Sequence, residues 1–254
     1  MDWIYISPHL DDVVLSCGGL VWEQAHQGEP VAIWTVCAGD PPALPFSPLA
    51  ETLHTRWQTG PAAVAQRRLE DEVACRELHV AFRHLSVPDC IYRHSPADGE
   101  VLYATEEAIC GPLHPADAGL VEELSRLLAN DLPRSATLVC PFAAGGHVDH
   151  QLTRAAVERL VQRDASTSQW SLWYYADYPY VRDPLVRAGL PMGVGWDVRT
   201  FPVSTPALSA WGKAVAAYAS QISTFWMDLD SMRVDLQNYA LQEGGVRLWA
   251  YSSV

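Results

Sequence analysis

The sequence predicts an α/β protein, with a doubly wound, mostly parallel sheet in a single domain that spans residues 1–254. Two observations predict this fold. Short runs of apolar, β-favouring residues alternate with longer helical patterns over most of the chain, and repeated strand–helix–strand units join parallel strands through right-handed crossovers. A chain of 254 residues is also long enough to bury the core of such a sheet as one unit.

The predicted elements follow one another in order. Residues 3–7 form a first apolar strand, and a helical pattern from 12 to 27 ends at Gly28. Residues 31–37 are continuously apolar, as expected of a parallel strand that is covered on both faces. The clearest helix, 62–78, carries its apolar residues among Arg and Glu: Val64, Leu69, Val73, Cys75 and Leu78. Further strands are expected near 82–87 and at 137–141 and 171–175, and further helices at 116–129, 152–162 and 211–229.

Two stretches, 40–49 and 92–115, are predicted to be long loops that follow strands. In open α/β sheets, loops at the carboxyl ends of strands build the ligand crevice, so these two stretches are expected to select the substrate. The alternation becomes less regular further along. We therefore divide the chain into a core of about residues 1–180 and a C-terminal elaboration of about residues 181–254.

The composition excludes several classes of partner. There are 30 Asp and Glu residues against 17 Lys and Arg, giving a net charge of −13, which disfavours nucleic acid and anionic membrane surfaces. The six cysteines include no C-x-x-C pair and are expected to be buried free thiols. No leader-type segment opens the chain, and no apolar run reaches the roughly 18 residues of a membrane span, so a cytoplasmic protein without a transmembrane segment is expected.

A cluster of chemically versatile side chains follows the first strand, in the segment Ser7-Pro8-His9-Leu10-Asp11-Asp12. His9 and Asp12 are three residues apart, which on a helical turn places both side chains on one face. An imidazole and a carboxylate at this spacing can bind one divalent ion, while Asp11 points elsewhere and is free to act as a base. Taken alone, the segment also fits a helix N-terminus whose acidic residues complement the helix dipole.

A second cluster, Gly145-Gly146-His147-Val148-Asp149-His150, follows the apolar run 138–142 and again joins a strand to a helix. Two such junctions of a parallel sheet can meet at the same edge. His9, Asp12 and His150 would then supply three protein ligands and leave one position open, which is the layout of a catalytic zinc ion. The alternative is a pair of structural histidines, His147 and His150, that cap a helix.

The motif Pro8-His9-x-Asp11-Asp12, together with His147-x-x-His150, resembles the PIG-L/LmbE family of N-acetylglucosaminyl deacetylases. The resemblance extends from the first strand to about Tyr180. It includes Arg67-x-x-Glu70 and Val87-Pro88-Asp89. The sequence departs from the pattern at Leu10 and Val148, where many relatives carry Pro, but neither difference removes a metal ligand. It implies a Rossmann-like fold and a Zn2+ ion, although nitrogen and oxygen ligands of this kind also accept Fe2+ or Co2+.

Carried over to this sequence, the resemblance makes His9, Asp12 and His150 the metal ligands. Asp11 becomes the general base, and His147, when protonated, a donor to the oxyanion. The implied reaction removes the N-acetyl group of an amino-sugar-containing small molecule or glycoconjugate. The chemistry is consistent, because zinc lowers the pKa of its water and polarises the acetyl carbonyl.

Other candidate residues have two readings each. By analogy with the family, Arg67 and Asp89 bind sugar hydroxyls, but Arg67 also has Glu70 or Asp71 as helical partners and Asp89 fits a turn. For Asp149, a place in the first turn of a helix is favoured over a role in orienting a ligand histidine. The histidines at 26, 54, 79, 84, 94 and 114 show no ligand spacing, and the aromatic cluster of 170–180 is predicted to be mainly core. Trp57 is a candidate for the substrate entrance.

Two other functions remain open at this point. The motifs define the reaction better than the acyl acceptor, so a metal-dependent amidase or esterase acting on a non-sugar acyl group is the first alternative. A non-catalytic ligand-binding module on a Rossmann-like scaffold is the second. It is disfavoured because no G-x-G-x-x-G follows the first strand, and because a binding site needs neither Asp11 nor His147. The oligomeric state is not specified by the sequence.

Overall fold

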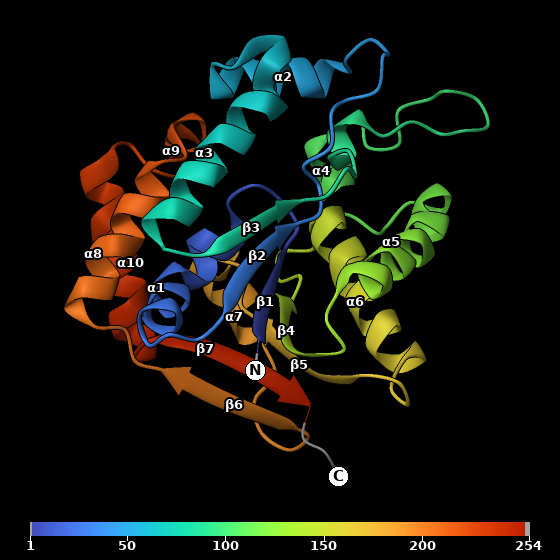
Figure 1. Ribbon diagram of the computed structural model, residues 1–254. Coiled ribbons are helices and arrows are strands. Elements are labelled where there is room, and N and C mark those ends of the chain that lie inside the picture. The colour runs from blue at the N-terminus through green and yellow to red at the C-terminus, as the bar shows by residue number, and fades with distance from the viewer. Residues whose placement is uncertain (1, 252–254) are drawn as a thin grey trace.

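The protein, described by a computed structural model over residues 2–251, is built around one seven-stranded sheet (Figure 1). The strands are β1 (Asp2–Ser7), β2 (Val31–Thr35), β3 (Ala81–His84), β4 (Ser135–Pro141), β5 (Gln169–Tyr175), β6 (Trp196–Phe201) and β7 (Val246–Tyr251). Their order in the sheet is β3-β2-β1-β4-β5-β7-β6. The first five are mutually parallel, while β7 runs antiparallel to both β5 and β6. The predicted doubly wound, mostly parallel sheet is confirmed.

Helices cover both faces of this sheet (Figure 1). They are α1 (Asp12–His26), α2 (Pro48–Trp57), α3 (Ala63–Glu77), α4 (Glu106–Ile109), α5 (Ala118–Asp131), α6 (Val148–Arg163), α7 (Pro184–Ala188), α8 (Thr205–Ala216), α9 (Ala219–Phe225) and α10 (Leu229–Glu243). Short 3-10 turns occur at η1 (Gly60–Ala62), η2 (Cys90–Tyr92), η3 (Pro115–Asp117) and η4 (Tyr180–Arg182). α1 and α3 pack against α8 on one side, and α5 packs against α6 on the other.

The C-terminal segment is integrated into the main core. The fully buried indole of Trp211 on α8 lies against α1 and donates from Nε1 to the carbonyl of Val14 at 2.6 Å. A Cβ atom added at Gly18 would lie only 2.4 Å from Cδ1 of Trp211. Because this glycine has no side chain, α8 can approach α1 closely enough to bury the indole. β6 and β7 extend the sheet, and α8 packs on α1. Residues beyond 180 therefore contribute both to the sheet and to a helical layer that covers it.

Several predicted elements need correction in this segment. The single helix expected at 211–229 is wrong: α8 ends at Ala216, α9 is a separate short helix, and a new helix begins at Leu229. Trp226 has extended backbone, and Asp228 starts α10 with a capping box to Ser231. β6, β7 and α10 were not predicted, and neither was α2, which begins at the end of the loop expected at 40–49.

The helix expected at 62–78 is present as α3, but two of the apolar residues assigned to it face solvent. Leu69 is 65% exposed and Val73 is 45% exposed. The buried side of α3 carries Val64 and Cys75, as expected, together with the charged residues Arg67, Glu70 and Asp71. An apolar pattern cannot reveal that charged residues share the buried face of a helix.

Two further expectations concern cysteines and membranes. All six cysteines are free thiols; five are buried and Cys110 is exposed. Among the helices of residues 2–251, none combines the length and apolarity needed to cross a membrane.

Candidate metal centre and active site

The two sequence motifs meet at one point of the sheet. The strand order reverses between β1 and β4, because the chain winds outward through β2 and β3 on one side and through β5 on the other. Ligands of doubly wound folds bind at such a switch point, beyond the carboxyl ends of the strands. The first motif follows β1, the second follows β4, and both lie at this edge.

The turn after β1 is fixed by its own polar groups. The Ser7 hydroxyl donates to the carbonyl of His9 at 2.7 Å and accepts from the backbone N–H of Val13 at 3.2 Å. The backbone N–H of His9 donates to Asp12 Oδ2 at 2.8 Å. These bonds hold His9, Asp11 and Asp12 in place at the start of α1, where all three are buried.

The turn after β4 depends on glycine. Gly145 has φ of 89°, and a Cβ atom there would lie 2.6 Å from Cδ1 of the Tyr180 ring. The chain then enters α6 through His147, whose Nδ1 accepts the backbone N–H of Asp149 at 3.2 Å and caps the helix. This geometry presents His147 to the pocket and places His150, one turn later, at the floor of the site.

The structure brings together the three side chains that the sequence nominates as metal ligands. Asp12 Oδ2 lies 3.0 Å from His9 Nδ1 and 3.3 Å from His150 Nε2. Two atoms bound about 2.0–2.1 Å from one tetrahedral zinc ion lie about 3.3 Å apart, so the spacing fits a shared ion. His150 Nε2 is buried and, among the described residues, makes no hydrogen bond despite its closeness to Asp12. An ion would use this otherwise unpaired nitrogen.

Each of these two histidines is oriented by a carboxylate at its other nitrogen. His9 Nε2 lies 2.9 Å from Asp149 Oδ2, and His150 Nδ1 lies 2.6 Å from Asp177 Oδ1. Metal-binding histidines in proteins commonly make this second contact, which fixes the ring and raises its basicity. The favoured reading of Asp149 as a first-turn residue alone is therefore wrong: it lies in the first turn of α6, but its fully buried carboxylate holds His9.

Sequence reasoning missed two supports of the metal centre: Asp177, which holds His150, and Arg93, which pairs with Asp149. Asp177 follows β5, so the strand-end rule that singled out the two motifs could have found it. Arg93, in the segment expected to be an unstructured loop, is buried between Asp149 (Nη1 to Oδ1, 2.5 Å) and Asp117 (Nη2 to Oδ2, 3.0 Å). The Tyr103 hydroxyl donates to the same Asp117 carboxylate at 2.7 Å. Loop 92–115 thus supplies the outer support of the centre.

Asp11 lies beside the centre and faces Arg67. Arg67 Nη2 is 3.3 Å from Asp11 Oδ2, so the alternative of a helical pair between Arg67 and Glu70 or Asp71 is wrong. Glu70 instead accepts hydrogen bonds from Ser220. Burial raises the pKa of Asp11 to about 7, against the opposing effect of Arg67. A carboxylate with a pKa near neutrality is suited to accept and return a proton.

His147 differs from the expectation in its charge. Burial and the neighbouring His9 lower the pKa of His147 to about 3, which favours a neutral ring over the expected protonated donor. Since Nδ1 accepts the N–H of Asp149, the neutral ring carries its proton on Nε2. Neutral His147 can still donate one hydrogen bond to an oxyanion.

Two buried thiols also lie near the centre. Cys37 is within metal-binding distance of His9 and Asp149, and Cys90 of His147 and Asp149. Burial raises the pKa of both thiols far above the usual value, so they stay protonated, whereas metals bind the thiolate. Asp149 is also already engaged by Arg93. A third group, His9, His147 and His150, brings its ligand atoms within 4.8 Å of one another without a thiol.

A pocket of about 250 Å³ opens above these residues. Asp89 lines it and also begins η2, where its Oδ1 accepts the N–H of Ile91; this bond fits the turn reading, and the contact with a sugar hydroxyl stays a prediction. Trp57 also lines it, as the last residue of α2 and not in a loop, with Arg67 stacked 4.9 Å from its ring centroid. His54, expected at the surface, is buried and bonded to the Tyr92 hydroxyl at 2.6 Å.

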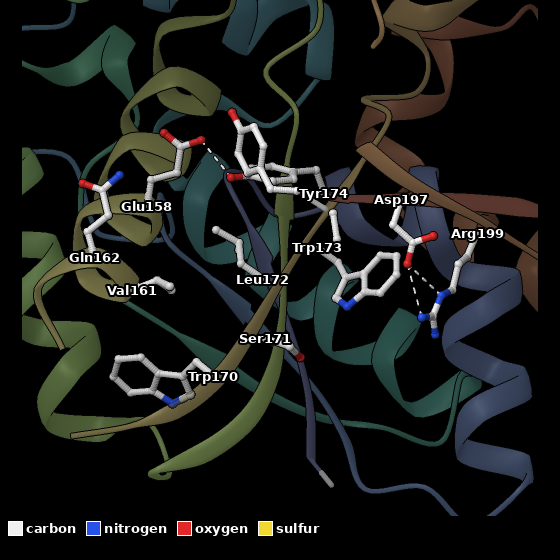
Figure 2. A pocket seen from close by; sticks show the side chains of 12 residues that line it. Glu158, Val161, Gln162, Trp170, Ser171, Leu172, Trp173, Tyr174, Asp197 and Arg199 are labelled. Carbon is white, nitrogen blue, oxygen red and sulfur yellow. Dashed lines mark hydrogen bonds and ion pairs between the residues drawn. The ribbon is translucent and has the colours of Figure 1, made fainter. Parts of the chain in front are cut away.

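A larger hollow of about 680 Å³ lies between α6, β5 and the β6–β7 pair (Figure 2). Its charged groups are occupied: Glu158 accepts from the Tyr174 hydroxyl, and Asp197 pairs with Arg199, which stacks on Trp173 (Figure 2). It contains none of the motif residues. The rest of the aromatic cluster of 170–180 is mainly buried, as expected, and Tyr180 borders the smaller pocket. The smaller pocket is the candidate active site.

Comparison with known proteins gives a consistent picture. A family model described as PIG-L, GlcNAc-PI de-N-acetylase, matches residues 4–161. The 2'-N-acetylparomamine deacetylase of Niallia circulans is 33% identical over 193 residues, which cover 70% of this chain and 67% of that protein. The enzyme of the same name from Streptomyces fradiae is 31% identical over 190 residues, covering 70% and 57%. The chain therefore spans about two-thirds of the first and just over half of the second.

Solved structures extend the likeness to the whole fold. The zinc-inhibited form of a teicoplanin deacetylase superposes with a TM-score of 0.81 at 29% identity, covering 98% of this chain and 97% of that one. A deacetylase–teicoplanin complex gives a TM-score of 0.78 at 30% identity, with the same coverage. Each of the two matches spans nearly the entire chain, so it extends over the region of β6 and β7.

Proposed function

The chain belongs to the PIG-L family, and from this premise we propose that it is a metal-dependent N-deacetylase that releases acetate from an amino-sugar-containing substrate. One observation carries the proposal. A single carboxylate oxygen of Asp12 lies next to a nitrogen of His9 and a nitrogen of His150, and both rings are oriented from behind by further carboxylates. We assign the metal to His9, Asp12 and His150, with Zn2+ as the first choice and Fe2+ or Co2+ as other ions that suit these ligands.

The chemistry follows from what each side chain can do. When bound, the metal ion would acidify the attacking water and polarise the acetyl carbonyl. Asp11 accepts the proton of that water as it attacks the carbonyl carbon, and then delivers the proton to the departing amine. His147 donates from Nε2 to the carbonyl oxygen as negative charge develops there. The C–N bond breaks, and acetate and the free amine leave.

The remaining assignments concern the sugar. Arg67 and Asp89 both line the pocket, and both have polar atoms suited to sugar hydroxyls. Arg67 acts in two ways in this proposal, because its Nη2 faces Asp11 while its Nε is buried without a hydrogen-bond partner among the described residues. A sugar hydroxyl that reached Nε would complete its bonding.

The test is acetate release from a panel of N-acetylated glycosides, using metal-reconstituted protein. Asp11→Asn is expected to lower kcat by about 10²–10⁴-fold, because the base is lost, while the metal content stays the same. Asp40→Asn is a matched control, since Asp40 is exposed and pairs only with Arg68. Full activity of the Asp11→Asn variant would refute the role of Asp11, and no acetate from any glycoside would refute the function.

The same panel separates the alternatives. An amidase or esterase for non-sugar acyl groups would release acetate from simple acetamides or acetate esters as fast as from glycosides. A non-catalytic binding module would retain stoichiometric metal and hydrolyse none of them. Preference for the amino-sugar compounds, abolished by chelation and restored by added metal, is the result expected here.

A further inference from the structure

The entrance of the active-site pocket is apolar, although its floor is polar. It is lined by Leu53 and Trp57 on α2, Ile91 on η2, Ile109 on α4 and Phe225 on α9. From these residues we infer that the amino sugar carries an apolar aglycone, alkyl or aryl, which lies against α2, α4 and α9. This inference rests on the proposed deacetylase function and specifies its substrate class.

The apolar wall is rigid because it is the surface of a separate hydrophobic cluster. Leu53, Trp57 and Ile91 are buried together with eight further side chains from α2, α3, α6 and the 90–103 segment, and this cluster is distinct from the core that surrounds the sheet. Ile109 packs on it from α4. A preformed apolar surface loses little entropy when a ligand covers it, so this part of the cost of binding is small.

The charges at the entrance are already paired. Arg56 on α2 and Glu106 on α4 form an ion pair of 3.1 Å that joins the two segments beside the opening. Arg67 faces Asp11, and Asp89 accepts the N–H of Ile91. Of the pocket-lining carboxylates outside the metal centre, Glu106 is paired with Arg56, and Asp89 has one oxygen on the N–H of Ile91 and the other 3.8 Å from His9 Nε2. A polycationic acceptor gains little here, whereas an apolar one covers the exposed parts of Ile109 and Phe225 and the remaining accessible edges of Leu53, Trp57 and Ile91.

Kinetics with a homologous series test the inference. The substrates are methyl, butyl and hexyl N-acetylglucosaminides, chains short enough to avoid micelles, together with the phenyl glycoside and 2'-N-acetylparomamine as a cationic probe. We expect kcat/KM to rise by at least about tenfold from methyl to hexyl, since full burial of one methylene corresponds to about a fourfold change in binding. The cationic probe should be the slower substrate.

The variant Phe225→Ala is expected to reduce the hexyl-to-methyl ratio to within about threefold. Leu185→Ala is the matched control, because Leu185 is 83% exposed and lies outside the pocket, and it should leave the ratio unchanged. If Phe225→Ala fails to fold, Ile109→Ala provides a second test at the same entrance.

A binding measurement gives an independent result. Cys110 is the one exposed cysteine and lines the pocket, so its alkylation reports occupancy. In metal-loaded Asp11→Asn protein, the hexyl glycoside should slow alkylation at concentrations where the methyl glycoside does not. A flat alkyl series, no differential protection, or faster turnover of the cationic probe would overturn the inference and leave the deacetylase function standing. Absence of acetate from every substrate would refute the function itself.

Discussion

Arg93 offers a sharp test of how the metal centre is supported. Its guanidinium is buried and bridges Asp149, which holds His9, to Asp117, which is bonded to Tyr103. Burial alone would raise the pKa of Asp149, but Arg93 and His9 lower it well below the usual value, so Asp149 is ionised. Replacing Arg93 with Met keeps most of the side-chain volume but removes the positive charge, and it leaves two carboxylates buried.

The expected magnitudes follow from this loss. Breaking a buried ion pair by removing one partner costs about 3–5 kcal/mol. For a protein of this size, 1 kcal/mol shifts Tm by about 2–4 °C, so Arg93→Met should lower the Tm of the metal-free protein by about 6–20 °C. Because Asp149 loses the group that holds it against His9, the metal Kd should also rise by about 10–100-fold.

The assays are thermal unfolding of the metal-free protein and metal titration against a competing chelator at a temperature where the variant is folded. Arg76→Met is the matched control, since Arg76 pairs with Glu72 at the surface of α3 and should cost no more than about 1 kcal/mol. Arg93→Lys keeps the charge and should recover part of the metal affinity. A large fall in Tm with an unchanged metal Kd would refute the positioning role, and a Tm change no larger than that of Arg76→Met would refute the energetic argument.

Two further predictions concern the histidines. His147→Ala should lower kcat by about 10²–10³-fold at unchanged metal content, because one donor to the oxyanion is lost; near-normal turnover at full metal occupancy would reject that role, and loss of the metal would make His147 a ligand. Asp12 and Asp177 raise the pKa of His150 to about 9, although burial opposes this shift. In metal-free protein the protonated histidine therefore contributes to the free energy of unfolding. This contribution is complete below pH 6.5 and is lost as the pH rises towards 9. Metal binding must displace that proton, so the metal Kd should fall as the pH rises through the same range, measured by chelator competition; a Kd independent of pH between 6.5 and 9 would contradict the value.

The chemistry of the site was predictable because it lies at strand ends. In a parallel sheet the carboxyl ends of neighbouring strands must lie at one edge, so residues that follow β1 and β4 had to come close once the topology was known. Asp12 and His150 are 138 positions apart in the chain, yet their side-chain atoms lie 3.3 Å apart. Within each motif, the spacing of three residues then indicated that His9 lies on the same face as Asp12, and His147 on the same face as His150.

The supports of the site were not predictable for a different reason. Arg93 lies in a segment without periodicity and Asp117 at the start of an expected helix, and their role comes only from the tertiary contacts that Arg93 makes with Asp149 and Asp117. The charge of His147 also depends on burial, which lowers its pKa, and no local pattern specifies burial at a helix start. The walls of the entrance come from α2 and α9, and neither was recognised as a separate helix.

The polar face of α3 explains why these parts belong together. Arg67 faces Asp11, and three and four residues later Glu70 binds Ser220 through its N–H (3.1 Å) and hydroxyl (2.6 Å), while Asp71 accepts from the Tyr218 hydroxyl at 2.6 Å. Residues at these spacings share one side of a helix. One face of α3 therefore contacts both Asp11, the proposed base, and the start of α9, the helix that carries Phe225 to the entrance. Both contacts come from this face of α3, so the position of Arg67 beside Asp11 and the position of α9 at the entrance depend on the same helix.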